Sequence, residues 1–154
     1  MLNYEIEDAS KVLAIARSLK KYKPPFRIVG GYRLIDNGID PEATVQIEAN
    51  GRVIHEASNG NGPVDALANV LKKGLTPLFP VIGEIKLVDF HASILDSKRG
   101  TSTDVEVTII FTDGTEIWRV HSLSENINNA SFNVLVDGFE FAVLKKTKAK
   151  RTKK

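Results

Sequence analysis

The segment SNGNGPVDAL, residues 58–67, combines residue types that could bind a small anion. Two glycines and two asparagines stand before Pro63, whose fixed φ suits the first turn of a helix. Gly62 or Asn61 can serve as the helix cap, and Asp65 adds negative charge in the first turn. The N–H groups at such a helix start lack intrahelical partners and could receive a carboxylate. A strand-to-helix turn that simply requires glycine explains the same residues, and on spacing alone it is the simpler interpretation.

No pattern in the sequence supports metal binding or covalent catalysis. The chain contains no cysteine, which excludes disulfides, thiolate zinc sites and cysteine nucleophiles. His55, His91 and His121 stand apart, without a second histidine at a spacing of two to four residues. Serines occur near these histidines, but no nucleophile elbow, paired carboxylates or phosphate loop accompanies them. We therefore expect no catalytic residue, no metal ligand and no cofactor site in this chain.

The charge of the chain is unevenly distributed. The formal net charge is +2, but the last ten residues, KKTKAKRTKK, carry seven of the 21 Lys and Arg residues and no acid, leaving 14 basic against 19 acidic residues. The body of the chain is thus acidic, which disfavours nucleic acid as a partner. We expect residues 147–154 to form a disordered basic tail. No long apolar run predicts a signal peptide or a membrane span, so we expect a cytoplasmic protein.

The first half of the chain reads as helix, three strands, helix. Residues 4–22 have helical apolar spacing and precede Pro24-Pro25, which predicts a linker helix within residues 1–23. Runs with strand character begin at Phe26, Glu42 and Arg52, and Asn50-Gly51 between the last two is a strong hairpin signal. The helix from Pro63 has one apolar face, made of Val64, Leu67, Ala68, Leu71 and Leu75.

The second half repeats the same order. Strand-like runs lie within residues 85–96, 103–114 and 115–124, and a helix starts near Asn126. Asp113-Gly114, the next tight turn, lies 63 positions after Asn50-Gly51, and the triplet NVL recurs at 69–71 and 133–135. The sequence thus predicts an α+β domain over 24–146, built from two βββα units at about 24–76 and 84–146. Each unit would pack an antiparallel three-stranded sheet with helices.

These residues carry a resemblance to a known family. GNGPVDALANVLKKGL closing the first unit, LVDFHASIL opening the second and the Asn-rich start of the last helix resemble the C-terminal regulatory domain of the 2-isopropylmalate synthase family. Within it, YKPPFRIVGGYRL and WRVHSLSENINNASFNVLVDGFEFAVLKK are more similar to the citramalate synthase branch. The resemblance covers roughly residues 22–146, and the N-terminal helix resembles the linker that follows the catalytic barrel of these enzymes.

The resemblance implies an allosteric function without catalysis. In the family this domain forms a homodimer and binds a branched-chain amino acid as feedback inhibitor, isoleucine in bacterial citramalate synthases and leucine in isopropylmalate synthases. A separate barrel with a divalent metal condenses acetyl-CoA with a 2-oxo acid. This chain has no His-x-His and is too short for a barrel of about 250 residues. It would therefore work with a barrel in cis or in trans, as part of a synthase or as a stand-alone sensor.

Carried over residue by residue, the resemblance places the effector site at Gly60, Asn61, Gly62 and Ala66, and on a facing strand at Asp89, Phe90 and His91. Backbone N–H groups would bind the carboxylate, Asp89 or a strand carbonyl the ammonium, and small Ala66 would leave room for the aliphatic part. Structural roles explain the strand residues as well: a turn contact for Asp89, core packing for Phe90 and strand packing for His91. The alternative function is a structural dimerisation module without a ligand.

Overall fold

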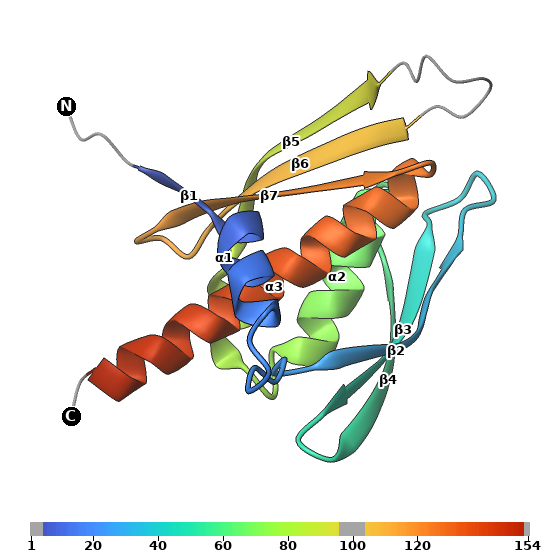
Figure 1. The fold of residues 1–154 in the computed structure, drawn as a ribbon. Helices are drawn as coiled ribbons and strands as arrows, with labels where there is room; N and C mark the ends of the chain where they lie inside the picture. The colour runs from blue at the N-terminus through green and yellow to red at the C-terminus, as the bar shows by residue number, and fades with distance from the viewer. Residues whose placement is uncertain (1–4, 96–103, 153–154) are drawn as a thin grey trace. The chain divides into compact units, whose positions relative to one another are not determined.

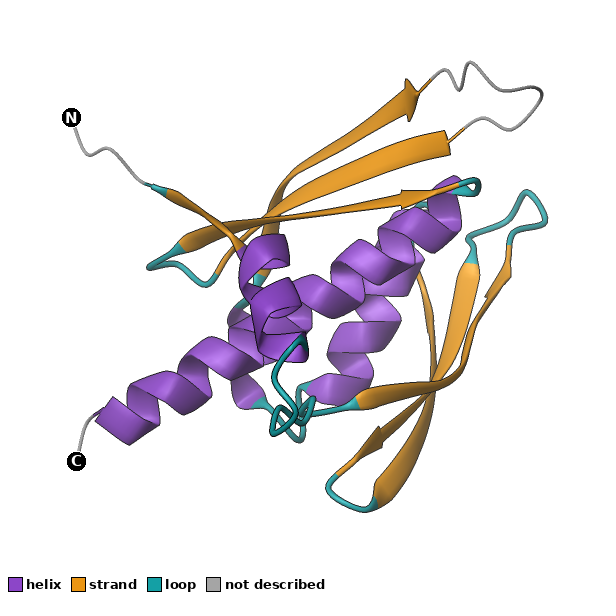
Figure 2. Ribbon diagram, viewed as in Figure 1, coloured by secondary structure: helices purple, strands orange, loops and turns teal. Residues whose placement is uncertain are grey.

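The computed structural model describes residues 5–95 and 104–152 (Figures 1 and 2). The chain divides into two compact units. Unit 1 contains the described residues up to Tyr22 and those of Glu84–Phe141, and unit 2 contains Lys23–Gly83 and the chain from Ala142 onward. The elements, in chain order, are β1 (Ile6–Asp8), α1 (Ala9–Arg17), β2 (Arg27–Ile35), β3 (Glu42–Ala49), β4 (Arg52–Asn59), α2 (Pro63–Leu75), a 3-10 helix η1 (Pro80–Glu84), β5 (Lys86–Leu95), β6 (Asp104–Thr112), β7 (Ile117–Ser124) and α3 (Ile127–Thr152). This order confirms the two βββα repeats and the α+β class.

Unit 2 is a three-stranded antiparallel sheet, in the order β2-β3-β4, covered by α2. Asn50 (φ 52°) and Gly51 (φ 75°) are both left-handed and join β3 to β4 with Ala49 opposite Arg52, so the predicted two-residue hairpin is confirmed. Alternation along β3 buries one face, and the predicted apolar face of α2 lies against it. The buried side chains are Ala43, Val45, Ile47 and Ala49 from β3 and Leu67, Val70, Leu71 and Leu75 from α2.

Unit 1 contains a four-stranded sheet in the order β1-β7-β6-β5. Its core is aromatic, because the Phe111 ring lies 6.1 Å from Trp118 and 6.0 Å from Phe139 of α3. The indole Nε1 of Trp118 donates a hydrogen bond to the Gly138 carbonyl at 3.2 Å, which satisfies the buried polar group of this side chain. The inward faces of β6 and β7 therefore pack directly on the first half of α3.

The N-terminal segment differs from the predicted linker helix. Residues Ile6–Asp8 form β1, which pairs in parallel with β7 and adds a fourth strand to the predicted three. The helix itself is confined to Ala9–Arg17, with the Asp8 carboxylate accepting a hydrogen bond from Lys11 N at 3.2 Å as its cap. The apolar Ile6 that fitted the helical spacing lies on the strand instead, because an N-cap aspartate separates it from the helix.

The predicted tight turn at Asp113-Gly114 is present as a four-residue loop: Thr112 pairs with Ile117, and the Asp113 carboxylate accepts from Thr115 N and Glu116 N, both at 2.8 Å. One further local prediction needs correction. The predicted disordered tail is helical up to Thr152, since α3 continues into residues whose Lys, Ala and Arg favour helix. No helix in the described part of the chain is long and apolar enough to span a membrane.

A buried carboxylate attaches the N-terminal segment to α3 within unit 1. Glu140 is only 4% exposed, and it accepts hydrogen bonds from the Tyr22 hydroxyl at 2.5 Å and from Arg17 Nη2 at 3.2 Å. Arg17 also donates to Asp137 at 2.7 Å. Burial raises the pKa of the Tyr22 hydroxyl well above its usual value, and the hydrogen bond to Glu140 raises it further. Although burial alone would lower the pKa of Arg17, the hydrogen bond and charge of Asp137 outweigh it.

We expect Tyr22→Phe to destabilise the chain by about 2 kcal/mol at pH 7, because it removes a donor to a buried carboxylate. The folded pKa of Tyr22 is raised, so its contribution is complete below the unfolded pKa of about 10 and declines as the pH rises above it. Urea denaturation at pH 7 and at pH 11 measures both effects. Tyr22→Phe should lose less stability between these two pH values than the wild type, and an unchanged stability at pH 7 would contradict the role of this hydrogen bond.

Candidate functional site

The register of sheet β2-β3-β4 brings two loops of unit 2 together. Glu42 at the start of β3 pairs with Asn59 at the end of β4, so the loop before β3 and the loop after β4 leave the sheet at the same end. The two loops are joined by a hydrogen bond from Gly60 N–H to the Pro41 carbonyl at 3.1 Å. The predicted glycine loop therefore lies beside residues 36–41, which sequence reasoning did not connect with it.

Each residue of the glycine loop has a distinct structural role. Gly60 lies against the first turn of α2, where an added Cβ would stand 2.3 Å from Ala66 N. Asn61 N–H donates to the Asp65 carboxylate at 2.8 Å. Gly62 is the N-cap of α2, followed by Pro63 at the first helical position as predicted. Ala66 is fully buried beneath the loop, and its N–H donates to the Gly62 carbonyl at 2.9 Å.

Some backbone N–H groups at the start of α2 have no acceptor among the described residues and remain for a ligand. The N–H groups of Gly60 and Asn61 are bonded within the protein. Within residues 5–95 and 104–152, no protein group accepts a hydrogen bond from the N–H of Gly62, Val64 or Asp65. These three donors lie at the start of α2, where the helix dipole favours negative charge. A carboxylate at this helix start would be bound by the N–H groups of Gly62 and Val64. Gly60 and Asn61 would shape the turn.

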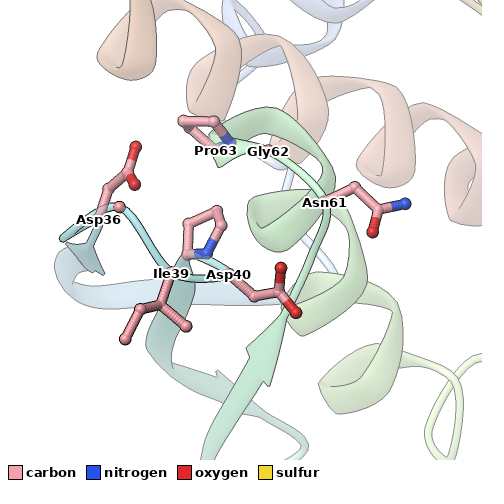
Figure 3. Close-up of a pocket in the computed structure, with 8 residues that line it drawn as sticks. Asp36, Ile39, Asp40, Asn61, Gly62 and Pro63 are labelled. Carbon is pink, nitrogen blue, oxygen red and sulfur yellow. The ribbon is translucent and has the colours of Figure 1, made fainter.

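An open hollow of about 460 Å³ lies between the two loops. Figure 3 shows Asp36, Ile39 and Asp40 on one loop across from Asn61, Gly62 and Pro63 on the other. Its complete lining consists of Asp36, Gly38, Ile39, Asp40, Pro41, Asn61, Gly62 and Pro63. The hollow thus combines two carboxylates, three apolar side chains and an open helix N-terminus, which are the groups that a small zwitterion with an aliphatic side chain requires.

The acidic loop carries a signal that sequence reasoning missed. IDNGIDPEA places two aspartates around Asn37-Gly38 and before Pro41, between two strands. Gly38 is left-handed (φ 87°), and the Asn37 side chain accepts from Ile39 N at 3.4 Å, as expected for a turn built by asparagine and glycine. The turn itself could be predicted from these residues. Their position beside the glycine loop follows only from the register of β3 with β4.

The other three predicted site residues lie on β5 in unit 1. Asp89, Phe90 and His91 are all exposed, and the Asp89 carboxylate accepts from Phe90 N at 3.0 Å. Phe90 retains 39% of its exposure, so it is not a core residue. The structure therefore brings Gly60, Asn61, Gly62 and Ala66 together in unit 2, whereas the three strand residues form a separate exposed group in unit 1.

The three histidines lie on three different strands, β4, β5 and β7. In the ranges that the structure describes, no group of three or more His, Asp or Glu side chains is placed to hold a metal ion.

Comparison with known proteins identifies the family. Residues 5–143 match the LeuA allosteric (dimerisation) domain. The chain is similar to (R)-citramalate synthases from Geobacter sulfurreducens (33% identity over 98% of this chain and 30% of the relative), Aquifex aeolicus (34%, 93% and 28%) and Synechocystis sp. (32%, 91% and 27%). The chain spans less than a third of the length of these curated relatives. The match over residues 5–143 and the doubled βββα architecture lead to one conclusion: the chain belongs to the LeuA allosteric (dimerisation) domain family.

Proposed function

We propose that this domain binds a branched-chain amino acid in the hollow beside the N-terminus of α2, as feedback effector of a citramalate or 2-isopropylmalate synthase. One observation carries the proposal: carboxylates and an open helix N-terminus line the same hollow. The barrel that responds would stand in cis or in trans, in a homodimeric cytoplasmic enzyme of branched-chain amino acid biosynthesis. Isoleucine is the favoured ligand because the relatives are named (R)-citramalate synthases, and leucine is the alternative.

The two charges of an amino acid fit the two walls of the hollow. Its carboxylate would accept from the N–H groups of Gly62 and Val64, which have no acceptor within the described residues. Its ammonium would lie beside Asp36 or Asp40 on the opposite loop. Asp89, Phe90 and His91 remain proposed contacts at the effector interface. The carboxylates and the helix start that line the hollow support charge recognition by the loops of unit 2.

The aliphatic side chain of the ligand would contact apolar residues of the hollow. Ile39 is 74% exposed, and Pro41 and Pro63 line the same space. Burial of exposed apolar surface contributes about 25 cal/mol per Å². A moved methyl group changes the binding free energy by only about 1–3 kcal/mol. The shape of this apolar surface therefore decides whether isoleucine or leucine binds more tightly.

Feedback inhibition further requires that the effector binds two states of the domain unequally. Unequal binding can arise where the ligand contacts parts of the domain that move apart. The hollow lies between two loops that a ligand would bridge. A domain that does not bind amino acids would instead act as a structural dimerisation module.

Titration calorimetry of the chain with isoleucine, leucine and valine tests the proposal. We expect saturable binding of isoleucine at one site per chain. Two analogues separate the charge contacts: 3-methyl-2-oxopentanoate lacks the ammonium, and 2-methylbutylamine lacks the carboxylate. Each should bind at least about tenfold more weakly, since a charge-assisted hydrogen bond contributes about 1.5–3 kcal/mol. Equal binding of the amine and isoleucine would exclude carboxylate recognition at α2.

A further inference from the structure

We propose that β5 is the contact strand of the homodimer, pairing antiparallel with β5 of a second copy across a two-fold axis at Phe90. This inference rests on the dimer of the proposed function and names the surface that makes it. Within the described residues, β5 is the last strand of its sheet, with β6 on one side and no strand on the other. A long exposed edge strand presents unpaired N–H and C=O groups to another chain.

The other three sheet edges are protected against such pairing. β1 has only three residues. β2 is interrupted by Gly30 (φ 70°) and Gly31 (φ 77°), where its register with β3 shifts. The carbonyls of Ala57 and Asn59 on β4 accept from Lys73 Nζ at 3.0 Å and Asn69 Nδ2 at 3.1 Å, so side chains of α2 cap that edge.

β5 lacks these protections along most of its length, although its register with β6 shifts at Val88 and the Asp89 carboxylate accepts from Phe90 N. It runs for ten residues with no proline, no glycine and a single lysine at its first position. In the part of the chain that the structure describes, no side chain from another element donates to its carbonyls. Four of its apolar side chains are exposed: Val88 (57%), Phe90 (39%), Ile94 (70%) and Leu95 (42%). Such an edge in a soluble protein is explained by a partner that covers it.

The sequence of β5 complements itself in one register. A two-fold contact requires that if residue i meets residue j, then j meets i. Centring the antiparallel pair on Phe90 places Asp89 opposite His91 twice, once on each side of the axis. The Asp89 Oδ1 atom accepts from Phe90 N, which leaves Oδ2 for the imidazole of the partner. Opposite polar pairs of this kind stabilise an antiparallel contact.

The same register continues the apolar face of unit 1 across the axis. Phe90 pairs with Ile109 of β6 and shares its face of the sheet, which is the buried face. Phe90 would meet Phe90 of the second copy on this face, whereas Val88 lies where the register of β5 with β6 shifts. The pairing therefore joins two four-stranded sheets into one continuous eight-stranded sheet, with aromatic contact at its centre.

Disulfide trapping reads this register directly, because the native chain has no cysteine. Phe90→Cys places two thiols on the axis, where opposed residues of an antiparallel pair have a Cα separation of about 4.5–5.5 Å, suitable for a disulfide. Val53→Cys is the matched control, because Val53 is 61% exposed on β4, an edge strand of the other sheet. On mild oxidation, Phe90→Cys should yield at least about tenfold more covalent dimer than Val53→Cys.

Sedimentation equilibrium of uncrosslinked variants tests the pairing independently. Asp89→Lys should weaken the dimer by about tenfold, and adding His91→Asp should restore it by exchanging the two charges. Trp118 fluorescence confirms that unit 1 is folded in each variant, since it is the single tryptophan. A wild type that stays monomeric, or a dimer that crosslinks no better through Phe90→Cys than through Val53→Cys, would overturn the assignment. In the second case effector binding and a dimer through another surface would both stand.

Discussion

Gly60→Ala is expected to destabilise unit 2 by about 3 kcal/mol, the upper range for steric overpacking. The new methyl would stand 2.3 Å from Ala66 N, 2.7 Å from Ala66 Cα and 2.7 Å from the Asp65 carbonyl carbon. All three atoms belong to the backbone of the first turn of α2, so no side-chain rotation relieves the clash. The loop would have to separate from the helix, and the hydrogen bond from Gly60 N–H to Pro41 would be lost with it.

Gly62→Ala is the matched control for this prediction. A Cβ at Gly62 meets nothing within 4 Å, and its extended backbone accepts alanine without strain. We expect a loss of at most about 1 kcal/mol, because alanine is a poorer N-cap than glycine but meets no neighbouring atom. Thermal unfolding followed by circular dichroism compares the two variants. Equal losses at both positions would mean that Gly60 does not pack on α2 as described.

Gly138→Ala is expected to destabilise unit 1 by about 2 kcal/mol. An added Cβ would lie 2.2 Å from Phe111 Cζ and 2.4 Å from Cε2. The ring cannot withdraw, because it is fully buried between Trp118 and Phe139. Overpacking of about 3 kcal/mol is offset by the helix propensity of alanine, about 1 kcal/mol better than glycine. Trp118 fluorescence during denaturation reports on this unit.

Gly74→Ala tests whether the clash, and not the loss of a glycine, causes the effect. Gly74 is also a buried helical glycine, but its Cβ would meet Ile47 Cδ1 at 2.8 Å, the end of a flexible side chain. Rotation of Ile47 removes the overlap, so the propensity gain and the packing cost should nearly cancel. A loss at Gly74 as large as at Gly138 would refute the argument from the rigid Phe111 ring.

Sequence patterns predicted the repeated part of the fold because local chemistry decides it. The alternation of Ala43, Val45 and Ile47 defines the buried face of β3, and the two-residue turn at Asn50-Gly51 defines the register of β3 with β4. The apolar spacing of α2 and the cap at Gly62 were readable for the same reason. These elements depend on neighbours within a few residues, which a sequence shows directly.

The missed features depend on contacts between distant residues. β1 forms because Ile6 pairs with Ile117, more than a hundred positions away, and three residues carry no strand signal of their own. Asp36 and Asp40 lie beside the glycine loop because Glu42 pairs with Asn59, a contact that no local pattern shows. The sequence also could not show which N–H groups of the loop are free for a ligand. The acceptors of the Gly60 and Asn61 N–H groups follow from the folded geometry.

Titration of isoleucine into the wild type and Gly62→Val tests the central claim, an effector site at the start of α2. The valine side chain enters open space beside the hollow, so this variant should remain folded and lose only the roughly 1 kcal/mol that a poorer N-cap costs. We predict saturable binding to the wild type and no measurable binding to Gly62→Val, because the branched side chain covers the Gly62 and Val64 donors. Absence of binding to a folded wild-type dimer, or unchanged affinity in Gly62→Val, would contradict the account.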